Sequence, residues 1–100
     1  MSSAAVRFHP AALDEAEAAT DWYRQRSIRA AEMFLDELDD AIHRIQNDAV
    51  QFPEHLFGTR RMVLRRFPYL VVFRVTTAAV EVIAIAHGYR RPGYWRDRVE

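Results

Sequence analysis

The stretch from residue 60 to residue 95 limits the folds open to this chain more than any other. It reads RRMVLRRFPYLVVFRVTTAAVEVIAIAHGYRRPGYW and contains three runs of strand-forming residues. Two of them, Tyr69–Val75 and Val80–His87, are apolar at almost every position and not only at alternate ones. A strand with this pattern needs cover on both faces. The chain is therefore expected to build a central sheet whose two faces are both shielded from water.

A helical hairpin is expected before these strands. Residues 5–8 form a short candidate strand, and Pro10 stands where proline begins a helix well. Ser27 is a suitable N-cap for a second helix, and Pro53 would stop that helix. The apolar residues of the second helix recur with the clearest 3.6-residue period in the chain: Ala31, Phe34, Leu35, Leu38, Ile42 and Ile45.

These elements predict one α+β domain covering residues 1–100. An N-terminal strand and a helical hairpin pack on one face of a mainly antiparallel four-stranded sheet. Two helices cover only one face of such a sheet. The second face needs either the C-terminal segment folded back over it or another chain docked on it. Because an apolar surface rimmed by arginines is typical of a protein interface, stable association with a partner is expected.

The charges of the chain are divided between its two halves. Residues 1–50 hold five arginines and ten acidic residues, whereas residues 51–100 hold nine arginines and four acidic residues. This division predicts a basic face for a polyanion or an acidic partner, and an acidic face that stays solvated.

Several classes of chemistry are excluded or disfavoured. There is no cysteine, hence no disulfide framework, thiolate metal site or cysteine nucleophile. His9, His43 and His55 lack ligand spacing, and the serines and glycines form no nucleophile or phosphate-binding motif. We therefore expect no metal ion and no small-molecule cofactor. The apolar runs are too short to cross a bilayer, and acidic residues interrupt the N-terminal region, so a cytoplasmic protein without membrane contact is expected.

Short motifs in a fixed order carry a family resemblance. They are Trp22-Tyr23 at the end of the first helix, the Phe52-Pro53 turn, the run Arg65-Arg66-Phe67-Pro68-Tyr69, and the closing His87-Gly88, Arg90-Arg91 and Pro92-Gly93-Tyr94-Trp95. With these motifs the chain resembles, over nearly its whole length, the RelE/ParE toxins of type II toxin-antitoxin systems, and it is more similar to the ParE side. The resemblance implies a small α+β domain that binds an antitoxin across its sheet and inhibits growth once the antitoxin is removed.

The family has two kinds of target. RelE-like members cut messenger RNA on the ribosome, and ParE-like members poison DNA gyrase. For the first kind, the resemblance implies that Arg65 and Arg90 stabilise the phosphate and that Tyr94 lies near the position of the terminal aromatic residue of RelE-like toxins. His87 or Tyr94 would then move protons. His87 is the side chain best able to exchange protons near neutral pH. The chain departs from that pattern because it has no lysine and carries Pro92-Gly93 after the last strand.

The leading hypothesis is a ParE-like toxin that binds gyrase and is neutralised by a cognate antitoxin. The alternatives are a metal-independent, ribosome-dependent endoribonuclease and a non-toxic interaction module of the same fold. The residues expected to serve partner binding are Arg61, Val63, Arg65, Arg66, Leu70, Val72, Arg90, Arg91 and Trp95.

Overall fold

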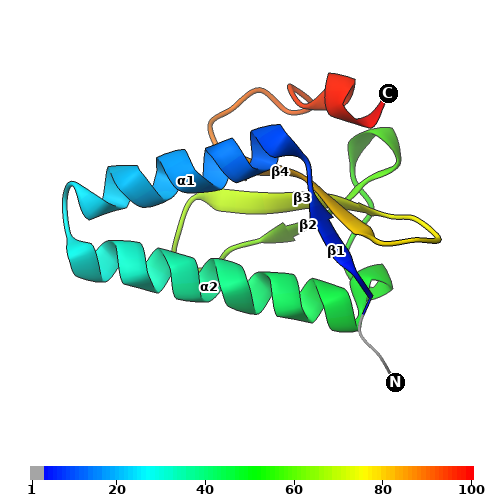
Figure 1. Cartoon of the computed structure of the whole chain (residues 1–100). Coiled ribbons are helices and arrows are strands. Elements are labelled where there is room, and N and C mark those ends of the chain that lie inside the picture. Colours follow the sequence, from blue (N-terminus) through cyan, green and yellow to red (C-terminus); the bar gives the residue numbers. More distant parts are fainter. Residues whose placement is uncertain (1–3) are drawn as a thin grey trace.

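The order of elements is the predicted one, in a computed structural model that describes residues 4–100. It runs β1 (Val6–Phe8), α1 (Pro10–Arg24), α2 (Ile28–Asn47), β2 (Arg60–Val63), β3 (Tyr69–Val75) and β4 (Val80–His87), with short 3-10 turns at Ala49–Gln51, Leu56–Gly58 and Arg96–Val99 (Figure 1). Residues 1–3 of the predicted domain lie outside the described part of the chain. The α+β class is thereby confirmed.

The four strands form one sheet in the order β1-β4-β3-β2. Strands β2 and β3 are antiparallel, as are β3 and β4, whereas β1 pairs in parallel with β4. The sheet is therefore mixed, a small refinement of the mainly antiparallel prediction. β1 and β2 are its two edge strands.

Local sequence determines where the helices begin. Pro10 is the first residue of α1, and the Nδ1 atom of His9 accepts a hydrogen bond from the N–H of Ala11 at 3.0 Å. The Ser27 hydroxyl accepts from the N–H of Ala30 at 3.1 Å, as expected of an N-cap. Helix α2 ends at Asn47, ahead of Pro53, because the chain turns into a 3-10 segment at Ala49–Gln51.

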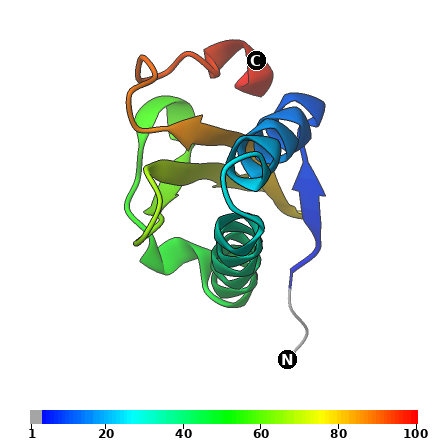
Figure 2. The same ribbon diagram turned by 90° about the vertical axis from the view of Figure 1, so that its left-hand side faces the viewer.

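The two helices lie side by side on one face of the sheet (Figures 1 and 2). Their small and apolar residues pack against inward-facing residues of β3 and β4. The fully or nearly fully buried members of this core are Ala12, Ala19, Phe34, Leu38, Ala41, Ile45, Leu64, Val71, Phe73, Val80, Val82 and Ile85. Removing a large member such as Phe34 would cost about 3–5 kcal/mol of stability.

The second face of the sheet is covered by the chain itself. Trp95, 2% exposed, packs there with Val72, Ile83, Ala84 and Ala86. Half-buried Leu70, Tyr94 and Val99 flank this second cluster. Of the two alternatives for this face, the folded-back C-terminal segment is the one observed, and no foreign chain is needed to bury Val72 and Trp95. Val63 of β2 stays outside the cover, with 61% of its surface exposed.

Candidate functional site

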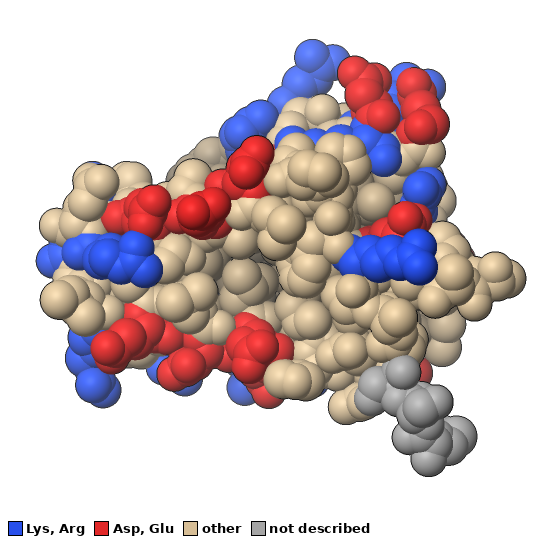
Figure 3. All heavy atoms as spheres, in the orientation of Figure 1, with Lys and Arg blue, Asp and Glu red and all other residues tan. Residues whose placement is uncertain are grey.

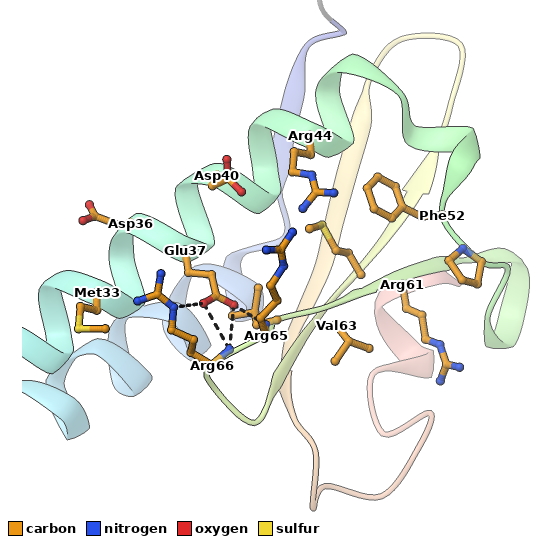
Figure 4. Close-up of a pocket in the computed structure, with 13 residues that line it drawn as sticks. Met33, Asp36, Glu37, Asp40, Arg44, Phe52, Arg61, Val63, Arg65 and Arg66 are labelled. Carbon is orange, nitrogen blue, oxygen red and sulfur yellow. Dashed lines mark hydrogen bonds and ion pairs between the residues drawn. The ribbon is translucent and has the colours of Figure 1, made fainter.

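A cavity of about 640 Å³ lies between helix α2 and the edge strand β2 (Figure 4), and we name it the α2–β2 groove. Helix α2 lends acidic side chains to one wall, and β2 with its following turn lends arginines to the other. Its lining residues are Met33, Asp36, Glu37, Asp40, Arg44, Phe52, Pro53, Arg61, Met62, Val63, Leu64, Arg65 and Arg66.

Three arginines of this groove have no anionic partner in the described part of the chain. Arg44, Arg61 and Arg65 form no ion pair within 4 Å among residues 4–100. Figure 4 shows the guanidinium groups of Arg44 and Arg65 extending toward each other from opposite walls. Two like charges in one cleft repel each other, so the arrangement favours an anion placed between them.

Glu37 is the groove's internal acidic contact. Its carboxylate accepts hydrogen bonds from the backbone N–H groups of Arg65 and Arg66 and lies 3.8 Å from the Nε of Arg66. Only 16% of this side chain is exposed, although the other acidic residues along α2 are solvated. Glu37 thus fixes the turn between β2 and β3 against the helix.

The outer edge of β2 is blocked at both ends and open in the middle. The N–H of Arg61 donates to the carbonyl of Pro53 at 3.1 Å, and the N–H of Arg65 donates to Glu37. Leu64 donates inward to Tyr69, so the alternation of an antiparallel pair turns the N–H of Val63 outward. Within residues 4–100 that N–H meets no acceptor. An extended segment of another chain would find one free pairing position there.

A second cavity, of about 420 Å³, lies between α1 and the ends of β3 and β4, and we name it the aromatic pocket. It shares no lining residue with the α2–β2 groove. Its lining residues are Glu15, Ala18, Ala19, Trp22, Tyr23, Pro68, Tyr69, Ile85, His87, Arg90 and Tyr94.

One carboxylate holds the rear wall of this pocket. Glu15 accepts from the N–H of Ile85 at 3.0 Å, from the Tyr94 hydroxyl, and from both terminal nitrogens of Arg98 at 2.8 and 3.0 Å. Glu15 and Arg98 are each 17% exposed at the side chain. Burial, together with the hydrogen bond to Glu15, raises the pKa of Tyr94 far above its ordinary value of 10.0. The Tyr94 phenol therefore stays protonated and donates to Glu15.

The Tyr69 and His87 rings, which meet edge to face, line the aromatic pocket together with the exposed Arg90. The His87 ring lies 5.0 Å from the Tyr69 ring and 5.2 Å from the Tyr89 ring, between ring centroids, and its Nδ1 atom accepts from the Tyr89 N–H at 3.1 Å. The guanidinium of Arg90 lies 3.9 Å from the centroid of the Tyr94 ring, which is cation–π geometry.

The structure divides the predicted catalytic residues between the two cavities. His87, Arg90 and Tyr94 line the aromatic pocket, and Arg65 lines the α2–β2 groove. The predicted partner-binding residues are divided as well. Arg61, Val63, Arg65 and Arg66 line the groove, whereas Arg90 and Arg91 are exposed near the pocket.

Three predicted partner-binding residues belong to the second sheet face instead. Val72 and Trp95 are buried in the cluster beneath the C-terminal segment, and Leu70 is half-buried beside them. A partner that left the C-terminal segment in place would not reach Val72 or Trp95. The exposed members of the predicted set are the arginines and Val63.

Sequence reasoning missed two acidic residues that organise these cavities. Glu15 is three residues after Ala12 and four before Ala19, so it lies on the buried face of α1. Glu37 is placed in the same way between Phe34 and Ala41 on α2. An acidic residue in register with an apolar stripe was the signal available for both.

The sequence profile described as "ParE toxin of type II toxin-antitoxin system, parDE" matches residues 6–92. The chain therefore belongs to the ParE toxin family of type II toxin-antitoxin systems. Its fold is similar to that of a solved structure titled "Chromosomal ParDE TA system from P. aeruginosa". The TM-score is 0.69 and the identity 21%, over 85% of this chain and 96% of that one. No curated protein matches the chain significantly in sequence.

Two further properties of residues 4–100 concern membranes and metals. No helix there is both long enough and apolar enough to span a bilayer. No three or more His, Asp or Glu side chains of that range gather in a way that could hold a metal ion.

Proposed function

We propose that the chain inhibits growth by binding DNA gyrase and that a cognate antitoxin neutralises it. Membership of the ParE family supports the toxin role, and the ParE-like branch that the sequence resembles is the one that poisons gyrase. The chemistry of the two cavities supports binding in preference to catalysis.

The antitoxin is proposed to occupy the α2–β2 groove. A carboxylate of the antitoxin would lie between Arg44 and Arg65, whose guanidinium groups extend toward each other without an ion pair. An extended backbone beside β2 would accept the free N–H of Val63, and apolar side chains would contact the exposed Val63 side chain and the Met33 and Phe52 walls. An acidic and apolar antitoxin segment fits this surface.

The state of Tyr94 is the observation that carries the choice of binding over cleavage. Cutting RNA without a metal needs one group that accepts a proton and one that releases it. Tyr94 releases its proton only at very high pH, because burial and Glu15 raise its pKa. Of the two arginines predicted to stabilise the phosphate, Arg90 lines the aromatic pocket with Tyr94, and Arg65 lines the α2–β2 groove. The four residues do not line one cavity, which supports binding in preference to cleavage.

A supercoiling assay tests the proposal. Purified chain is expected to block DNA supercoiling by gyrase and to leave ribosome-bound messenger RNA intact. Addition of the cognate antitoxin should restore supercoiling. The antitoxin gene is expected next to this one and should encode a DNA-binding repressor with an acidic and apolar tail. Growth that continues normally when the chain is induced alone would instead indicate the non-toxic interaction module.

One observation favours ribosome-dependent endoribonuclease activity as a second candidate. His87, Arg90 and Tyr94 line one cavity, and the Nε2 atom of the His87 ring makes no hydrogen bond within residues 4–100. Under this reading the double change Arg65→Ala and Arg90→Ala abolishes RNA cleavage while the domain stays folded. Cleavage that persists at the wild-type rate in the double variant would remove these arginines from the mechanism.

A further inference from the structure

The aromatic pocket is rich in the residue types that dominate binding energy at protein interfaces. Trp22 is 50% exposed and Tyr89 93% exposed, although both are large aromatic side chains. Arg26 lies over the Trp22 ring at 3.6 Å from its centroid. Tryptophan, tyrosine and arginine are the residues most often found in interface hot spots. Trp22 lines the pocket, whereas Tyr89 and Arg26 lie beside it, against the lining residues His87 and Trp22, so together they indicate a contact surface.

The charge of the pocket is positive where a ligand would meet it. Glu15 is the only acidic residue among its lining residues in the described chain, and Tyr94, Arg98 and Ile85 already occupy both of its oxygens. Arg90, like the neighbouring Arg91, forms no ion pair within residues 4–100. The pocket lining also includes the apolar side chains of Ala18, Ala19 and Ile85. This combination suits a large apolar side chain accompanied by a carboxylate.

The pocket is held in shape before any ligand arrives. Glu15 fixes Tyr94, and the Tyr94 ring carries the Arg90 guanidinium at 3.9 Å. The N–H of Gly88 donates to the carbonyl of Pro68 at 2.7 Å and so joins the end of β4 to the start of β3 at the pocket. Because these groups are already ordered, binding loses little additional conformational entropy. A rigid recess of this kind serves recognition better than catalytic rearrangement.

We propose that the aromatic pocket is the surface that engages the gyrase target, while the α2–β2 groove engages the antitoxin. This inference rests on the proposed function and assigns the two partners to different cavities. The gyrase segment that enters the pocket presents a large apolar side chain next to a carboxylate. The apolar side chain packs on Trp22 and Tyr69, and the carboxylate pairs with Arg90.

Single substitutions in each cavity separate the two partners. Trp22→Ala and Arg90→Ala should each weaken binding to purified gyrase about tenfold or more, with antitoxin affinity unchanged. Arg65→Ala should do the reverse. Arg29→Ala, an exposed arginine of α2 that lines neither cavity, is the matched control and should change neither affinity. Retained antitoxin binding also reports that the pocket variants are folded, and Trp22→Phe should keep most of the gyrase affinity.

The remaining outcomes all decide the proposal. If the wild type binds gyrase and the pocket variants bind it equally well, the pocket assignment fails and the proposed function stands. If the pocket variants lose both partners to the same extent, the two partners share one surface and the assignment is again overturned. If the wild type does not bind gyrase, the proposed function and this inference fall together. If the wild type cleaved RNA and these variants did not, the occupant of the pocket would be a nucleic acid and not a gyrase segment. Added salt should weaken gyrase binding by the wild type more than by Arg90→Ala, because it screens the Arg90 ion pair.

Discussion

The carboxylate of Glu15 joins three parts of the chain that are far apart in sequence. It lies on α1, takes the backbone N–H of Ile85 from β4, and holds Tyr94 and Arg98 of the C-terminal segment. Four hydrogen-bond donors therefore converge on one partly buried carboxylate. This one side chain therefore fixes both the cover of the second sheet face and the rear wall of the aromatic pocket.

Replacing Glu15 with Gln should destabilise the chain by about 1–3 kcal/mol, because the neutral amide leaves the partly buried Arg98 without its counter-charge. Urea unfolding of the two chains measures the difference. Glu17→Gln, at an exposed position of the same helix, is the control and is expected to stay within about 0.5 kcal/mol of the wild type. Equal midpoints for the two variants would show that the contacts of Glu15 contribute nothing to stability.

His55 makes stability depend on pH near neutrality. Burial, and after it the positive charge of Arg61, lowers the pKa of His55 below the ordinary value of 6.5. The unfolded chain then binds a proton at this site more readily than the folded chain does. The free energy of unfolding therefore falls as pH drops through 6.5 toward the folded-state pKa, and it is recovered above 6.5.

Thermal unfolding checks this sign. The melting temperature of the wild type should decrease as pH falls from about 7.5 to 5.5, and His55→Gln should show a smaller decrease over the same range. The comparison is between slopes, since the substitution itself alters packing against Trp95. His43→Gln, on the exposed face of α2, is the control for a histidine with open access to water. Parallel slopes for wild type and His55→Gln would rule out His55 as the source.

At the scale of elements, the C-terminal segment and the loop before β2 hold each other in place. Phe57 has the left-handed backbone φ of 58°, which is unusual for a bulky residue, and its ring packs on Trp95 at 5.8 Å between centroids. Gly93 also has a positive φ, of 81°, and lies directly against Phe57. The two segments are ordered together, which is why Trp95 can close the second face of the sheet.

Two glycine substitutions separate steric contact from backbone strain. Both Gly58→Ala and Gly93→Ala place a side chain at positive φ, which costs about 1 kcal/mol. A Cβ at Gly93 would also lie 2.9 Å from Cε2 of Phe57, whereas a Cβ at Gly58 meets nothing within 4 Å. Gly93→Ala should therefore be the more destabilising by about 1–2 kcal/mol in urea unfolding. Equal losses would mean that Phe57 moves away freely and that the two segments do not depend on each other.

The elements were predictable because their signals are local. The period of α2, the Ser27 cap, the proline at the start of α1 and the two continuous apolar strands each depend on neighbours within a few residues. The cover of the second sheet face was stated as two alternatives, because nothing near Trp95 tells which surface its ring will reach. The Glu15 contacts span up to 83 residues, and no short pattern encodes them.

The same limit explains the outcome at the candidate site. Individual residues such as Arg61, Val63, Arg65 and Arg90 were predicted from charge and resemblance, and all four line a cavity. Their division between two cavities depends on whether each residue lies beside α1 or beside α2, a property of the assembled fold. Val72 was assigned to a partner because alternation along one strand does not show that the chain's own end covers it.

At the scale of the whole molecule, the opposite charges of the two halves of the sequence gather on different parts of the surface. Acidic side chains gather along both helices, as Figure 3 shows. Arginines without ion pairs remain in the groove beside β2 and at the mouth of the aromatic pocket. Two separate surfaces that each carry arginines without ion pairs within residues 4–100 allow two different acidic partners on one small domain.

Hydrogen–deuterium exchange of the chain bound to each partner is the most direct test of whether the antitoxin and gyrase occupy different surfaces. The cognate antitoxin should slow exchange along β2, including the outward N–H of Val63, and leave residues 87–91 unchanged. Gyrase should slow exchange around residues 87–91 and the end of α1 and leave β2 unchanged. Protection of β2 by both partners, with none at residues 87–91, would contradict the assignment of the two surfaces.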